Sequence, residues 1–275
     1  MEADRESPRL SLDIATIVAA GVVAYALVAT VHEALGHGAA CLAVGAHAAA
    51  VSTTELRCDG VSGSSALIVT SSGSVANLLV GLAAFAAFRV ARPGDGRILL
   101  LGWLLCGWNL FHAGSYLLTG ALFGFGDWGR VAGVVHPPIL GQIGVGLVGA
   151  AIVLLGQRVA TDALWQPLVG IGDDRAARWP TITWPALGGG AAVSILAGIL
   201  SPLRPEFALL TSVLAPLSLL WLVRLPRWPT ADNPSEAVPI GRSAALLGIS
   251  LLVGVIFVLA LGPGLGSFAG YSIAR

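Results

Sequence analysis

Apolar residues form long, nearly unbroken runs along this chain, and most of the charged residues are gathered in the stretches between them. A run of about 20 apolar residues is long enough for an α-helix to cross a bilayer. The pattern predicts an all-α polytopic membrane protein, with residues 1–275 forming a single membrane domain. Seven spans are predicted, at about residues 12–44, 65–88, 98–122, 139–157, 182–201, 206–223 and 243–262.

The composition supports this class. The 275 residues are 56% hydrophobic and only 11% charged, and the mean hydropathy is +0.84, whereas soluble domains carry roughly 25% charged residues. The formal net charge is zero, so nothing in it favours a nucleic-acid partner. Membrane lipids are the expected surroundings.

All fifteen basic residues are arginines, and they alternate between the two sides of the predicted spans. The N-terminal tail and the second, fourth and sixth loops hold eleven: Arg5, Arg9, Arg89, Arg92, Arg97, Arg158, Arg175, Arg178, Arg224, Arg227 and Arg242. The alternate segments hold four: Arg57, Arg130, Arg204 and Arg275. Because arginine-rich loops stay in the cytoplasm, the N-terminus is predicted to be cytoplasmic and the C-terminus to lie outside.

Three ionisable residues interrupt the first apolar run. In "VATVHEALGHGAACLAVGA" (28–46) they are His32, Glu33 and His37. Ionisable groups at membrane depth are costly, so they indicate a functional site. Imidazoles are good zinc ligands, and a neighbouring glutamate is suited to take a proton from water activated by the metal. The segment therefore predicts a site for one Zn²⁺ ion, with Glu33 as the general base.

The spacing of the histidines leaves two interpretations open. His32 and His37 are five residues apart, which offsets them by about 140° on a regular α-helix. A π-bulge around Ala34–Gly36 would realign both imidazoles, and such bulges are common at functional sites. In a regular helix, Glu33 and His37 would instead be the ligands, with His32 behind them. The bulge is the favoured interpretation.

Other polar residues are predicted near the same level of the membrane. Asp127, in "FGFGDWGRV" (123–131), follows the third span on the side where the first span ends, so it is the predicted third ligand. His112 is an alternative ligand. Asn77 and Asn109 have two possible roles. They either hydrogen-bond helices together, or position a substrate and polarise its carbonyl group.

The chain has three cysteines, Cys41, Cys58 and Cys106, and no two of them form a C-x-x-C motif. This spacing gives no indication of a disulfide framework. Cys41 and Cys106 are predicted to be buried thiols in apolar helices.

Three segments in order resemble the site-2 protease family of intramembrane zinc metalloproteases. They are "VHEALGHGAACLAVGA", "SSGSVANLLVGLAAF" and "WNLFHAGSYLLTGALFGFGDWGRV". The resemblance implies a metalloprotease-like core over 12–130, with additional helices over 139–262. It also implies that His32, His37 and Asp127 bind zinc, that Glu33 is the base, and that residues 50–58 form an edge strand able to pair with a substrate backbone.

The resemblance implies hydrolysis of a membrane-embedded or juxtamembrane peptide bond. Two alternatives remain at this stage. One is a metal-dependent membrane enzyme that acts on a lipid or small amphiphile. The other is a non-catalytic membrane scaffold whose polar cluster only holds helices together.

Overall fold

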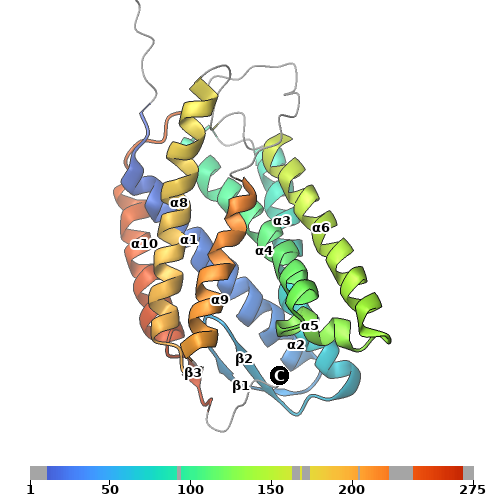
Figure 1. The fold of residues 1–275 in the computed structure, drawn as a ribbon. Helices are drawn as coiled ribbons and strands as arrows, with labels where there is room; N and C mark the ends of the chain where they lie inside the picture. Colours follow the sequence, from blue (N-terminus) through green and yellow to red (C-terminus); the bar gives the residue numbers. More distant parts are fainter. Residues whose placement is uncertain are drawn as a thin grey trace, which may run out of the picture.

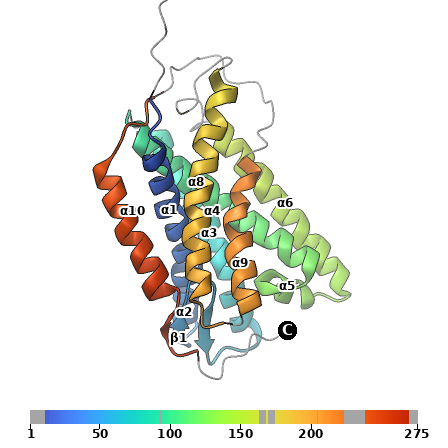
Figure 2. The ribbon, with the colours of Figure 1, turned by 60° about the vertical axis from the view of Figure 1, so that its left-hand side comes forward.

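Long helices run side by side through most of the structure, and a small sheet lies at one end of them (Figure 1). A second view shows the same arrangement (Figure 2). The computed structural model describes residues 11–91, 94–162, 168, 174–203, 205–222 and 238–268.

The helices follow the predicted spans closely. Within the described residues, six are long and apolar enough to cross a membrane. The predicted span at 206–223 is instead a shorter apolar helix. The elements are α1 (Ile14–Thr30), the π-helix η1 (Val31–Gly38) and α2 (Ala39–Ala43), then α3 (Gly63–Ala91), α4 (Gly96–Phe123), α5 (Gly126–Gly133), α6 (Pro138–Asp162), α8 (Asp174–Ile199), α9 (Pro205–Leu217), the 3₁₀ turn η2 (Ser218–Leu222), α10 (Ala244–Ile256) and the π-turn η3 (Phe257–Leu261).

The inner and outer helices differ in what they bury. α4 packs against α3 and α6, and α1 packs against α8 and α10. Trp103, Trp108 and Phe111 of α4 are fully buried. In contrast, α6 and α10 expose large apolar side chains, including Leu147 and Leu251. Apolar surface of this extent is unusual on a soluble protein, and it is consistent with a multi-pass membrane protein.

The sheet corrects the prediction of one strand over residues 50–58. Two strands, β1 (His47–Val51) and β2 (Leu56–Asp59), pair antiparallel on either side of a turn. On its other side β1 pairs with β3 (Leu265–Gly266), which gives the order β2-β1-β3. β1 is therefore central, and within the described residues β2 and the two-residue β3 are the edge strands.

A disulfide between Cys41 and Cys58 corrects the expectation that the cysteines would not pair. The left-handed backbone of Gly45 turns the chain after α2, and the hairpin then returns β2 to the helix. This brings the two Cα atoms to 5.9 Å although 17 residues separate them in sequence. Cys106 is a buried free thiol, as predicted.

Candidate metal centre

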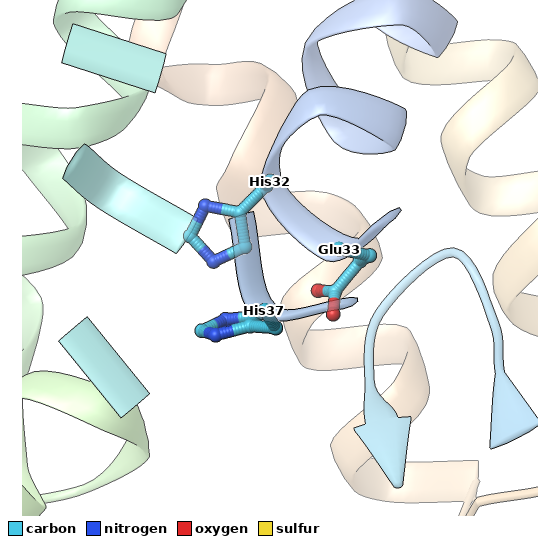
Figure 3. A group of neighbouring side chains, drawn as sticks. All are labelled: His32, Glu33 and His37. Atoms are coloured by element: carbon cyan, nitrogen blue, oxygen red, sulfur yellow. The ribbon is translucent and has the colours of Figure 1, made fainter. Parts of the chain in front are cut away.

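The π-helix η1 aligns the two histidines. Its end shows the five-residue hydrogen bond of a π-helix, donated by the Ala39 N–H to the Ala34 carbonyl. Residues five apart then share a face, and both imidazoles project into the same space (Figure 3). The predicted π-type distortion is confirmed, and it covers Val31–Gly38 rather than Ala34–Gly36 alone.

Four side chains with potential metal-ligating atoms converge here. His32, Glu33 and His37 are buried, and one ligand atom of each lies within 4.8 Å of the others. Asp127, at the start of α5, approaches both imidazoles. Its Oδ2 lies 3.2 Å from His37 Nε2 and 3.7 Å from His32 Nε2. The structure thus brings Asp127 to the histidines, where the sequence placed it.

The Nδ1 atoms of both rings are hydrogen-bonded to neighbours in α3, and the Nε2 atoms face Asp127. His32 Nδ1 lies 2.7 Å from Asn77 Oδ1, and His37 Nδ1 lies 2.7 Å from the Val69 carbonyl oxygen. Both partners are acceptors, so each Nδ1 carries the proton. The Nε2 atom of a neutral ring then has a free lone pair, as a metal ligand requires.

The surroundings of these nitrogens fit a cation. Burial alone would raise the pKa of the Asp127 carboxyl, but the neighbouring His37 and His32 side chains hold that pKa below its usual range, so the carboxyl is ionised and needs a positive counter-charge. His32 Nε2 is buried and has no hydrogen-bond partner within the described residues. A metal ion between the carboxylate and the two imidazoles would supply the positive charge and occupy the lone pairs.

Two glycines leave the space for such an ion. A Cβ atom added to Gly73 of α3 would lie 2.6 Å from the Nε2 atoms of both His32 and His37. A Cβ atom added to Gly36 would lie 2.5 Å from the Gly73 Cα. The π-helix and α3 therefore approach more closely than larger side chains would permit, and the imidazoles point at the gap above Gly73.

Asp127 is held by its own short helix. The neighbouring Trp128 donates its indole N–H to Ser74 Oγ at 2.8 Å, which fastens α5 to α3. Gly120 and Gly129 provide the room, because a Cβ atom at Gly120 would meet Trp128 of α5 and one at Gly129 would meet the Gly124 backbone after α4. The glycine-rich run "FGFGDWG" is thus a tight turn that returns the carboxylate to the histidines.

The two asparagines support the site from behind. Asn77 Nδ2 donates to the Val28 carbonyl at 3.0 Å and to Asn109 Oδ1 at 2.7 Å, and its Oδ1 accepts from His32. Asn109 Nδ2 donates to Leu105 at 2.7 Å. Both residues are fully buried. This geometry favours the helix-joining alternative over direct contact with a substrate.

A pocket opens beside the candidate metal-ligating group, with about 660 Å³ of empty space that includes open solvent. It lies between α1, α4 and α9, under the turn that joins β1 to β2. Its lining includes His32, Glu33, Thr53, His112 and Tyr116. The alternative ligand His112 reaches this wall, with its ring centroid 5.1 Å from that of His32. It is therefore close to the site, but on the pocket side.

Sequence patterns did not single out Tyr116, Trp128 or the hairpin turn as parts of the site. Tyr116 lies seven residues after Asn109, so both share one face of α4 with His112, and this spacing could have revealed it. The hydrogen bond between Trp128 and Ser74 joins residues 54 positions apart in sequence, so no local sequence pattern indicates it.

Comparison with known proteins gives no match to a protein-family model, to a curated protein or to a solved structure.

Replacement of Gly73 by alanine should impair metal binding, because its Cβ would fill the gap between the imidazoles. We expect zinc affinity, measured by chelator competition on purified protein, to fall by roughly tenfold or more. Gly144→Ala is the matched control, since a Cβ there meets nothing within 4 Å. Equal zinc affinity in the two variants would contradict this geometry.

Replacement of Asn77 by alanine should weaken zinc binding without removing a ligand. The His32 ring would lose the acceptor that fixes its tautomer and orientation. Loss of such a supporting partner typically lowers metal affinity by about 10- to 100-fold. The same competition measurement tests this, and an unchanged affinity would show that Asn77 does not orient His32.

Proposed function

We propose that the protein is a zinc-dependent intramembrane metallopeptidase that hydrolyses a membrane-embedded or juxtamembrane peptide bond. The observation that carries the proposal is the convergence of His32, His37 and Asp127 on one gap, with Glu33 beside it. Two imidazoles and one carboxylate, with room for water, are a common ligand set of catalytic zinc. The resemblance of the three sequence segments to the site-2 protease family also supports it.

The pocket distinguishes the roles of the two carboxylates. Glu33 lines it, whereas Asp127 does not, and Glu33 Oε2 is buried without a hydrogen-bond partner within the described residues. We therefore assign Asp127 as a ligand and Glu33 as the general base. A zinc ion held there would acidify a water molecule and polarise the substrate carbonyl.

Hydrolysis then requires Glu33 to move one proton. Its carboxylate takes the proton from the attacking water as the oxygen adds to the carbonyl carbon. When the carbon–nitrogen bond breaks, Glu33 returns that proton to the departing amine. A buried carboxylate that faces the pocket is suitably placed for both transfers.

A peptide substrate fits the surroundings of the site. The turn between β1 and β2 places Thr53 and Thr54 on the wall of the pocket, and both hydroxyls lack partners within the described residues. β2 offers an open edge on the same hairpin. An extended backbone needs such donors and acceptors once it leaves a helix.

We also propose that the site faces the non-cytoplasmic side of the membrane. The disulfide between Cys41 and Cys58 lies at the sheet end, and disulfides persist in oxidising compartments. Arg57 and Arg130 are at this end, whereas Arg89, Arg97, Arg158, Arg178 and Arg242 are in or beside helix ends that face away from the sheet. The side chain of Arg175 and residues Arg5, Arg9, Arg92, Arg204, Arg224, Arg227 and Arg275 lie outside the described set.

Replacement of Glu33 by glutamine should preserve zinc but abolish turnover. Purified wild-type and Glu33→Gln proteins should each hold one zinc per chain by elemental analysis, whereas His32→Ala and Asp127→Ala should hold none. Loss of the base should slow hydrolysis by about 10²- to 10⁴-fold. The substrate for this assay is the membrane peptide that co-purifies intact with Glu33→Gln, identified by mass spectrometry.

The result separates the alternatives. Absence of zinc from carefully prepared wild-type protein would contradict the metal site. Undiminished cleavage by Glu33→Gln would exclude Glu33 as the base. Recovery of a lipid instead of a peptide would favour an enzyme that acts on a lipid or small amphiphile.

Cysteine labelling should show the orientation in intact cells. The native thiols are paired or buried, so a single added cysteine reports its own position. Ser64→Cys, at the sheet end of α3, should react with a membrane-impermeant maleimide, and Arg242→Cys, before α10, should react only after lysis. The reverse pattern would place the site on the cytoplasmic side.

A further inference from the structure

The hydrolysis proposed above needs a hydrogen-bond donor that the asparagines cannot supply. As water adds to a peptide carbonyl, the carbonyl oxygen becomes negative, and a fixed donor stabilises it more than it stabilises the substrate. The Asn77 amide hydrogens go to Val28 and Asn109, and Asn109 donates to Leu105. Neither asparagine lines the pocket, so both amides lie behind His32, away from a substrate bound there.

Tyr116 presents a free donor on the pocket side. Its ring packs edge-on against His32, with the centroids 4.9 Å apart. Its hydroxyl lies near Gly126, the residue before Asp127, because a Cβ atom at Gly126 would be 3.7 Å from that oxygen. Tyr116 lines the pocket with Glu33. None of the hydrogen bonds within the described residues engages its hydroxyl.

His112 supports Tyr116 but is not itself a suitable donor. Its ring stacks on Tyr116 at an interplanar angle of 17° and a centroid distance of 5.8 Å. The Ala215 backbone lies beside its ring, and a neutral imidazole that donates to this carbonyl has only a lone pair on its other nitrogen. His112 therefore fixes the position of the phenol.

We propose that Tyr116 is a catalytic residue that donates its phenolic hydrogen bond to the carbonyl oxygen of the peptide under attack. The bond forms at the wall of the pocket beside His32, while Glu33 handles the proton of the water. No covalent bond to Tyr116 forms or breaks. This inference rests on the proposed peptidase function, because only a reaction that develops charge on an oxygen needs such a donor.

The test compares two probes on the zinc-loaded protein. One is a phosphinic dipeptide, whose tetrahedral phosphorus carries two oxygens as the reacting carbon does. The other is the same dipeptide with a thiol in place of the phosphinate, which ligates zinc through sulfur and presents no oxyanion. Tyr116→Phe should weaken phosphinate binding roughly 10- to 100-fold, with thiol affinity and zinc content unchanged. Calorimetry in detergent measures each affinity.

Matched variants make the result specific. Tyr25→Phe removes another phenol from the same pocket. Tyr25 lies two turns of helix before His32, and its phenol oxygen accepts a hydrogen bond from Ser194 of α8. It should change the ratio of phosphinate to thiol affinity far less than Tyr116→Phe does. Thr53→Val removes the other candidate hydroxyl. If Thr53→Val, and not Tyr116→Phe, lost affinity for the phosphinate alone, Thr53 would be the donor and the proposal would be overturned.

The remaining outcomes also decide the question. Equal losses for both probes in Tyr116→Phe would show that Tyr116 only shapes the pocket, and no loss would show that it does not act on the oxyanion. Either result overturns the inference and leaves the peptidase function standing. Wild-type protein that binds neither zinc nor the probes would overturn both.

Discussion

The close contact between the π-helix η1 and α3 is the constraint on which the site depends. Five-residue hydrogen bonding places His32 and His37 on one face, and the two glycines at positions 36 and 73 allow the backbones to approach. Because α3 is so near, its Val69 carbonyl and Asn77 side chain reach the outer nitrogens of both rings. A bulkier residue at position 73 would separate these partners and also fill the space at which the rings point.

Polar groups inside an apolar bundle are costly unless they are paired, and here nearly all are paired in a chain. His32 donates to Asn77, Asn77 to Asn109 and to the Val28 carbonyl, and Asn109 to its own helix. Among the buried side-chain atoms without a partner in the described residues are His32 Nε2 and Glu33 Oε2. These two atoms are ones that a metal ion and a water molecule would engage.

The sequence predicts much of this arrangement because its strongest signals are local. Apolar runs mark the six long helices, and the spacing from His32 to His37 indicates the π-helix. Other features depend on the tertiary fold. Cys41 meets Cys58 only because the chain turns back after Gly45, and β1 becomes central only because β3 returns from the far end of the chain. Asn77 could not be assigned to an orienting role until its partners were known.

The sheet gives the site a fixed border rather than a loose covering. The disulfide ties β2 to α2, β3 pairs with β1, and the Thr53 N–H donates to the Leu261 carbonyl at the end of η3. The turn above the pocket is therefore held from several sides. In the proposed reaction a helical substrate would have to unwind at the scissile bond before Glu33 could reach it, because the backbone groups of a helix already bond to one another. The rigid hairpin would stabilise the unwound backbone through the edge of β2 and through the Thr53 and Thr54 hydroxyls, which have no partner within the described residues.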